Sequence, residues 1–174
     1  MAAKKQSDSF FLRISNNKGA TAGFEQEEYD LGAYVDALGK SVLRIHNIQC
    51  IIQTDTNPGK GPAASAAAGD MNVYWQLTTT SHSDWVLADD KSVVACGRLF
   101  TGKDAGNQVV IIDETANINP STFDLGYLIA TESVYLGVEN DNAADADYTV
   151  TLMCECTVES MDERAAMALA LSQQ

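Results

Sequence analysis

Apolar and polar residues alternate most regularly near the C-terminus, over residues 148–158. Six residues share the apolar parity of this segment: Tyr148, Val150, Leu152, Cys154, Cys156 and Val158. The residues between them are mainly threonine and glutamate. Side chains of a β-strand point alternately to its two faces, so a period of two predicts a strand with one face on a core. We therefore predict a half-buried antiparallel strand here.

The same period returns along most of the chain, between turns rich in Gly, Asn and Asp. The segments are residues 10–15, 41–54, 73–77, 85–87, 92–100, 108–112 and 133–138. In 41–54 the apolar parity shifts between Ile45 and Ile48, which predicts either a bulge near His46 and Asn47 or burial of both faces. We predict an all-β fold, an antiparallel β-sandwich of the jelly-roll type with about eight strands.

A short helix is expected after the last strand. Residues 160–163 match the S-x-x-E capping box, and the residues that follow are rich in Ala, Leu and Met. Met161, Ala165 and Leu169 would share one stripe of this helix. Isolated helices shorter than roughly 12–15 residues are marginal in water, so the helix must dock. It packs either on its own sandwich or on a neighbouring subunit, and we predict these three residues as its assembly contacts.

The chain of 174 residues fits one domain with short tails. We divide it into a flexible N-terminal arm (1–9), the jelly-roll sandwich (10–159) and a helical tail (160–174). No apolar run approaches the roughly 18–20 residues that a membrane span needs. No apolar stretch follows Lys4 and Lys5, so the N-terminus does not resemble a signal peptide, and we expect the chain to be made and used, or assembled, inside a cell.

Charge narrows the range of partners. The chain carries 24 acidic and 11 basic residues, which gives a net charge of −13. Such a surface repels the phosphates of nucleic acids, and the basic pair Lys4 and Lys5 is too small to overturn that. We therefore expect no direct binding to nucleic acid.

The four cysteines, Cys50, Cys96, Cys154 and Cys156, lie in apolar, strand-like segments. Cys154 and Cys156 are two apart in one strand, which is poor geometry for a disulfide. The spacing also lacks the paired knuckles of a zinc site. We expect free, buried thiols that pack as small apolar side chains.

The remaining candidate chemistry is sparse. His46 lies within a strand, and His82 follows a threonine run beside Asp84, with no nucleophile motif near either. We therefore predict no enzymatic activity and no catalytic residue. Trp75 lies on the apolar parity of its strand and should be buried. Trp85 follows a polar turn and is the candidate for stacking against a ligand, such as a sugar.

The acidic segment 139–147 could hold a structural cation through Asp141, Asp145 and Asp147, because carboxylates are hard oxygen ligands. It lacks the spacing of an EF-hand, however, and a solvated loop is the simpler interpretation. We expect no other metal and no cofactor.

The layout resembles small single-jelly-roll capsid proteins of tailless icosahedral viruses of archaea and bacteria. The resemblance lies in residues 10–14, 41–52, 133–140 and 149–159, together with the polar arm and the C-terminal helix. It carries no diagnostic motif. It implies a virion protein that assembles in the host cytoplasm into an icosahedral shell, with copies of itself and with other capsid proteins. It also implies an internal membrane close to the shell, although the chain has no transmembrane segment of its own.

Two other classes of function stay open. The chain could be a decoration, turret or filament subunit, which would also assemble. It could instead be a monomeric carbohydrate-binding sandwich, in which Trp85 would contact the sugar. Large assemblies would favour a capsid subunit or a decoration, turret or filament subunit. A stable monomer would favour the carbohydrate-binding sandwich.

Overall fold

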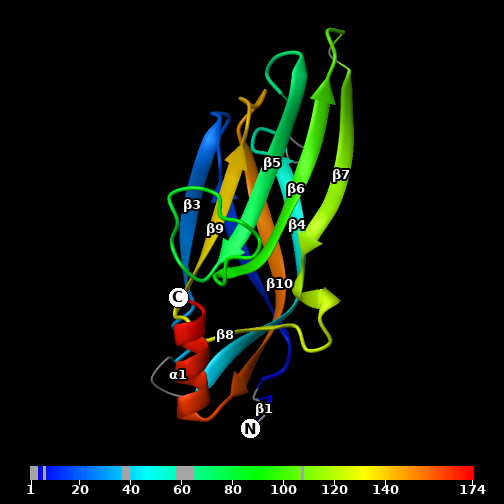
Figure 1. Ribbon diagram of the computed structural model, residues 1–174. Coiled ribbons are helices and arrows are strands. Elements are labelled where there is room, and N and C mark those ends of the chain that lie inside the picture. Colours follow the sequence, from blue (N-terminus) through cyan, green and yellow to red (C-terminus); the bar gives the residue numbers. More distant parts are fainter. Residues whose placement is uncertain (1–3, 6, 37–39, 58–64, 107) are drawn as a thin grey trace.

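The computed structural model describes residues 4–5, 7–36, 40–57, 65–106 and 108–174. These residues form two antiparallel β-sheets packed face to face, with one α-helix at the C-terminus (Figure 1). Among them, no helix is long and apolar enough to cross a membrane.

One sheet, called sheet A here, is centred on β10 (Tyr148–Ser160). On one side of β10 lie β1 (Lys4–Lys5) and β2 (Phe10–Asn17), and on the other lie β4 (Ser41–Thr54) and then β8 (Tyr127–Ile129). Sheet B has the order β3 (Gly23–Asp30), β9 (Ser133–Asn140), β5 (Gly69–Thr78), β6 (Val93–Lys103) and β7 (Val109–Ile118).

The strand order is that of a jelly roll. From β2 to β5 and again from β8 to β10, consecutive strands alternate between the two sheets. This crossing places strands that are distant in sequence side by side, such as β2 and β10. The predicted antiparallel jelly-roll sandwich with a C-terminal helix is confirmed.

The core lies between the inner faces of the two sheets. Leu136 and Val138 of β9 face Val150 and Leu152 of β10 across it, and all four are fully buried. Burying a side chain of this size stabilises the fold by about 1.5–3 kcal/mol. The alternation that predicted the strand at 148–158 therefore marks its contact with this core.

A bulge interrupts the pairing of β4 with β10, as predicted. Glu155 pairs with Asn47 and Cys156 pairs with Ile45, which leaves His46 as the extra residue. The His46 ring instead forms a hydrogen bond of 2.9 Å between its Nε2 atom and the Thr157 hydroxyl. The bulge restores apolar residues to the inner face on both of its sides.

On the C-terminal side of the bulge, β10 is buried on both of its faces. Thr157 and Glu159 were expected on the polar face, yet both are buried. The Arg44 guanidinium donates to both carboxylate oxygens of Glu159, at 2.6 and 2.8 Å. This bidentate ion pair compensates the buried charge of Glu159.

Gly126 lies directly against the backbone of Ile45 at this end of sheet A. Its φ of +64° lies in the left-handed region, and a Cβ atom there would come within 2.3 Å of the Ile45 carbonyl oxygen. A glycine is therefore required at this position.

Side chains seal two open edges of sheet A. The Tyr29 hydroxyl accepts from the Ser15 amide at 2.7 Å and donates to the Ser15 carbonyl at 2.5 Å. On the opposite edge, the Asn119 amide accepts from the Ile48 N–H at 3.3 Å and donates to the Ile48 carbonyl at 2.8 Å. Both side chains supply the hydrogen bonds of a missing strand.

One predicted strand is wrong, and two strands of the structure were not predicted. Residues 85–87 are not a strand, because they belong to the loop between β5 and β6 and lie outside sheet B. The strands β3 and β8 were not predicted: β3 is an edge strand with five acidic or amide side chains, and β8 has three residues. Neither gives a clear period of two.

The predicted arm is partly described. Lys4–Lys5 pair with β10 as β1, and the Ser7 hydroxyl accepts from the Val158 amide at 2.8 Å. Residues 1–3 and 6 lie outside the described residues. The flexibility of the arm, and the division into arm, sandwich and tail, stay predictions.

Candidate functional site

The C-terminal helix begins two residues later than the capping-box pattern indicates. Ser160 is the last residue of β10, and Asp162 is the N-cap of α1 (Glu163–Ser172). The Asp162 carboxylate accepts from the Ala165 amide at 3.0 Å. The prediction of Ser160 as the cap was therefore wrong, because β10 continues through it to pair with β4.

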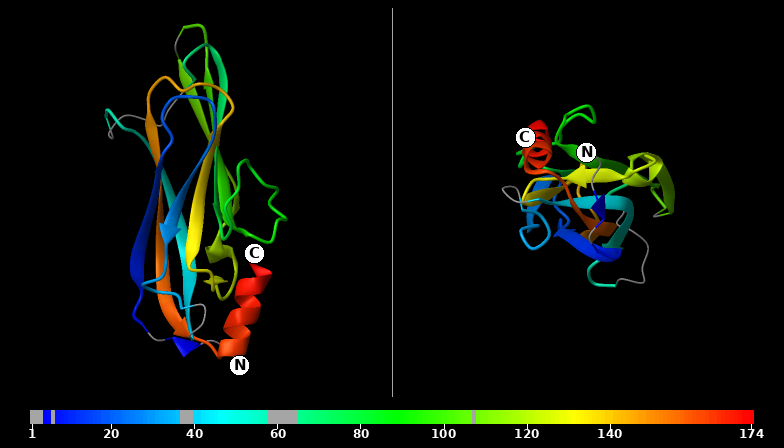
Figure 2. Two further views of the ribbon diagram at one scale, coloured as in Figure 1. Left: turned by 90° about the vertical axis from the view of Figure 1, so that its left-hand side faces the viewer. Right: turned by 90° about the horizontal axis from the view of Figure 1, so that it is seen from below.

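The helix docks on its own sandwich (Figure 2). Ala166 is fully buried against Val42 and Ala130, and Met161 and Leu169 pack around this small cluster. Two of the three predicted assembly residues thus contact their own chain, and the third, Ala165, is half-buried. Their role in assembly stays a prediction.

Gln173 ties the end of α1 to sheet A. Its side chain accepts from the Ala130 N–H at 3.1 Å and donates to the Leu128 carbonyl at 2.6 Å, as a neighbouring strand would. Its own carbonyl accepts from the Thr79 hydroxyl at 2.5 Å. No pattern in the sequence points to Gln173, because an isolated glutamine in a helical tail looks like any solvated residue.

The outer side of the helix presents apolar side chains to solvent. Met167 and Leu171 are one turn apart, so they share a stripe, and they are 43% and 64% exposed. Phe123 and Leu125, in the segment that leads to β8, are also exposed. We call these four residues the basal apolar residues. Such side chains near one end of the molecule are candidates for contact with another protein.

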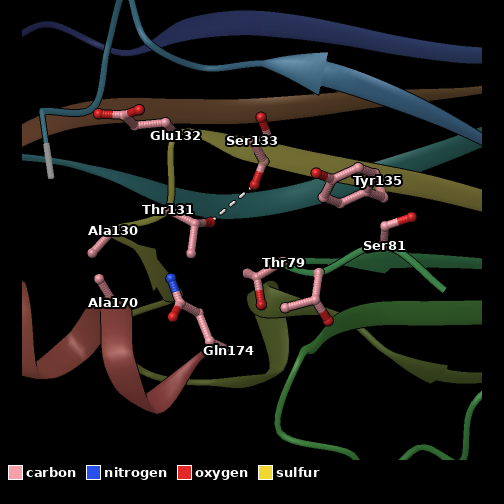
Figure 3. A pocket seen from close by; sticks show the side chains of 10 residues that line it. Thr79, Ser81, Ala130, Thr131, Glu132, Ser133, Tyr135, Ala170 and Gln174 are labelled. Carbon is pink, nitrogen blue, oxygen red and sulfur yellow. Dashed lines mark hydrogen bonds between the residues drawn. The ribbon is translucent and has the colours of Figure 1, made fainter.

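A groove of roughly 550 Å³ lies between the end of α1 and sheet B (Figure 3). Five of the hydroxyls that line it donate their protons within the protein: Thr79, Ser81, Thr131, Ser133 and Tyr135. Two of them, on Ser133 and Tyr135, donate to the same Glu28 carboxylate oxygen. The groove is thus lined by oxygen atoms that can accept hydrogen bonds. A sixth lining hydroxyl, on Thr80, lies 3.0 Å from the Nε2 atom of His82.

The loop between β5 and β6, residues 79–92, is anchored to the outer face of sheet B. The Gln26 side-chain oxygen accepts from the Ser81 hydroxyl at 3.0 Å and from the His82 amide at 2.8 Å. The His82 Nε2 atom lies 2.9 Å from the Ser92 hydroxyl, which donates to Asp90 at 2.6 Å. The two ends of the loop are therefore held together.

This histidine network is not a nucleophilic triad. The Ser92 hydroxyl lies between the other two groups and gives its proton to Asp90, so His82 has no serine proton to remove. The Asp90 carboxylate accepts from both the hydroxyl and the backbone amide of Ser92, and these two hydrogen bonds lower its pKa. Asp84, which the sequence places beside His82, accepts instead from the Trp85 amide at 2.8 Å.

Trp85 lies against Tyr74 of sheet B. The two ring centroids are 5.3 Å apart and the ring planes meet at 60°. Beside them is a small pocket of roughly 250 Å³, lined also by Cys96, Gly97 and Arg98. Trp75, which follows Tyr74 in β5, lies in the core and is 5% exposed, as predicted.

The carboxylates of the acidic segment between β9 and β10 do not converge on one position in the described structure. Asp141 accepts from the backbone and side-chain amides of Asn72, at 2.8 and 2.6 Å. The Asp147 carbonyl accepts from the Asp55 amide at 2.9 Å. Within the described part of the chain, no three His, Cys, Asp or Glu side chains come together as a metal site. A cation held by Asp141, Asp145 and Asp147 stays a prediction.

All four cysteines are free thiols, and Cys154 and Cys156 are fully buried in the core. Burial raises the pKa of Cys156 to about 12 and also raises the pKa of Cys154. Neither is a thiolate near neutral pH, so neither is a nucleophile. Cys96 differs, because it lines the pocket beside Trp85.

No protein-family model and no curated protein matches the chain. Among solved structures, an unassembled VP1 pentamer of KI polyomavirus matches with a TM-score of 0.50 and 8% identity, over 93% of this chain and 99% of that chain. This likeness agrees with the jelly-roll topology of the two sheets.

Two further matches are weaker. A structure of maize chlorotic mottle virus matches with a TM-score of 0.35 and 8% identity, over 88% of this chain and 95% of that chain. Latent PorU of Porphyromonas gingivalis has a TM-score of 0.37 and 7% identity, over 90% of this chain and 13% of that chain. At such identities a likeness shows the fold alone, because one fold serves many functions.

Proposed function

We propose that this chain is a structural subunit of a viral capsid. The observation that carries the proposal is the jelly-roll fold, which matches the VP1 chain over 93% of this chain with a TM-score of 0.50. The network of His82 and Ser92 does not favour an enzyme, because the Ser92 hydroxyl gives its proton to Asp90.

The basal apolar residues support contact between copies. Each copy carries a net charge of −13, so two copies repel one another at long range. Apolar burial must then supply most of the attraction, and Met167 and Leu171 offer it on a helix that is held in place by Gln173. A fixed helix loses little conformational freedom when a neighbour binds.

In this proposal the subunits form an icosahedral shell of a tailless virus, alone or with a second capsid protein, in the host cytoplasm. The acidic surface keeps the shell from binding the packaged nucleic acid directly. A decoration or filament subunit would use the same contacts in an assembly that does not close.

Particle size tests the proposal. We expect the purified chain to form large closed particles, visible by light scattering and negative-stain electron microscopy. Added salt should favour them, because it screens the repulsion between acidic copies. A chain that stays monomeric at high concentration and high salt would contradict the capsid role, and open filaments would favour the filament subunit.

Paired variants test the contact surface. Met167→Glu with Leu171→Glu should block assembly and leave the thermal midpoint unchanged, because both side chains are exposed. The matched control is Phe11→Glu with Ile51→Glu, which places the same charges on the outer face of sheet A, where the wild-type residues are 59% and 41% exposed. Assembly lost in the control and kept in the helix variant would move the contact to sheet A.

A further inference from the structure

We propose that the corner between Tyr74 and Trp85 binds one neutral sugar ring in its pyranose form. This site lies on the outer face of sheet B and does not depend on the capsid role. A capsid subunit, a decoration protein or a monomer could each carry it.

The shape of the corner fits one ring. The two aromatic planes meet at 60°, so they form two walls of a pocket of roughly 250 Å³. Sites for drug-sized ligands measure about 300–1,000 Å³, so this pocket is too small for an extended oligosaccharide to be enclosed. Aromatic faces carry partial negative charge and attract the polarised C–H groups of a sugar ring.

The corner is formed before any ligand binds. Trp85 belongs to loop 79–92, which Gln26 holds through Ser81 and His82. The hydrogen bond between His82 and Ser92 joins the two ends of that loop. A pre-organised aromatic wall costs little conformational entropy on binding, which matters for a ligand with few contacts.

Polar groups surround the aromatic walls. Arg98 lines the pocket, and Glu139 lies on the other side of Tyr74, paired with it across the two strands. Gln76, on the same face of β5, pairs with Cys96, which lines the pocket. The Gln76 side chain is 0% exposed, and neither its nitrogen nor its oxygen has a hydrogen-bond partner. Gln76 is fully buried and does not line the pocket, so a sugar bound there does not reach its amide.

The surroundings favour a neutral ligand over an anionic one. Burial raises the pKa of Glu139, and the negative charges of Asp84 and Asp141 raise it further. Arg98 adds one positive charge to the lining, but the two carboxylates nearby and the net charge of −13 make the surroundings acidic as a whole. An acidic sugar would enter against this field, whereas a neutral sugar would not.

Nuclear magnetic resonance of the full chain tests the site. The probes are the methyl glycosides of glucose, galactose and N-acetylglucosamine, and the signals are the indole N–H groups of the two tryptophans. We expect a saturable shift of the Trp85 signal with at least one glycoside, with a dissociation constant in the millimolar range, and no shift of the Trp75 signal. Absence of a saturable Trp85 shift with all three glycosides would overturn the proposal.

Variants separate binding from folding. Trp85→Ala and Tyr74→Ala should each abolish sugar binding, followed on backbone amide signals. Leu87→Ala, in the same loop but not in the pocket, should bind as the wild type does, and all three variants should keep cooperative thermal unfolding. Binding retained in Trp85→Ala would contradict the site, and tighter binding of sialyllactose than of the neutral glycosides would overturn the ligand class.

Cys96 provides a second measurement. In a Cys50→Ser background, a bound glycoside should slow the alkylation of Cys96 by iodoacetamide, because Cys96 lines the pocket. An unchanged rate at saturating glycoside would show that the sugar binds elsewhere and would overturn the site.

Discussion

The two sheets bury their inner faces in the same way and differ in their outer faces. Loop 79–92 covers part of the outer face of sheet B, and α1 lies on the same side of the sandwich below that loop (Figure 2). On sheet A, the middle of the outer face is accessible to solvent in the described part of the chain: Phe11 is 59% and Ile51 is 41% exposed, and we call this surface the bare face.

This difference shows where polar residues can be buried in a sandwich. Gln76 lies on the outer face of sheet B and is 0% exposed. Gln49 lies on the outer face of sheet A and is exposed. Both side chains point outward, but the Phe24 ring lies next to Gln76 over Gly137. The neighbours on the outer face, and not the period of two, therefore decide the burial.

Truncation of the shared core should have the largest effect and should be similar in the two sheets. Leu136→Ala in sheet B and Leu152→Ala in sheet A each remove a fully buried side chain. We expect each to lower the free energy of unfolding by about 2–5 kcal/mol, measured by urea denaturation. A cost below about 1 kcal/mol in either sheet would show that the inner faces are not equivalent.

Release of the covering loop should have an intermediate effect. Gln26→Ala removes the hydrogen bonds to Ser81 and His82, and we expect a loss of about 1–2 kcal/mol with faster proteolysis within 79–92. The matched control, Gln49→Ala on the bare face, should stay within about 0.5 kcal/mol of the wild type. Equal effects of the two substitutions would remove the distinction between the outer faces.

The core thiols should make stability depend on alkaline pH. The pKa of Cys156 is raised from 9.0 to about 12, so the folded state keeps a proton that the unfolded state loses. This contribution is complete below about pH 9 and declines as the pH rises from 9 towards 12. Urea midpoints should therefore fall over this range, and less steeply in Cys156→Ala. An equal slope in both proteins would contradict the assignment.

Cysteine labelling compares the two faces directly. At a pH near 8, iodoacetamide should modify Cys96, on the outer face of sheet B, before Cys154 and Cys156, which face the core. The two core thiols should react only when the protein unfolds. Mass spectrometry of the peptides measures the order, and early labelling of Cys154 would be inconsistent with the core as described.

The smallest effect is expected on the bare face. Phe11→Ser and Ile51→Thr should each change stability by less than about 0.5 kcal/mol, because the wild-type side chains are 59% and 41% exposed. Thermal denaturation measures this. A larger loss would indicate that a partner or another part of the chain covers sheet A.

The candidate site was only partly predictable. Trp85 stood out because it follows a polar turn, and the structure places it against Tyr74. Tyr74 and Arg98 were not singled out, because they pair across the neighbouring strands β5 and β6, and the pairing of two strands leaves no signal in the local sequence. The helix was predicted, but its buried contacts at Ala166 and Gln173 were not.

The sequence by itself determined most of the strands that face the core, but not β3 or β8. Alternation along residues 148–158 and the parity shift at His46 are local patterns, and each followed from the chemistry of adjacent residues. Only the tertiary structure decided what covers the outer faces and where the helix docks. Those contacts join residues far apart in the chain, such as Gln26 with His82 and Thr79 with Gln173, and a local period carries no information about them.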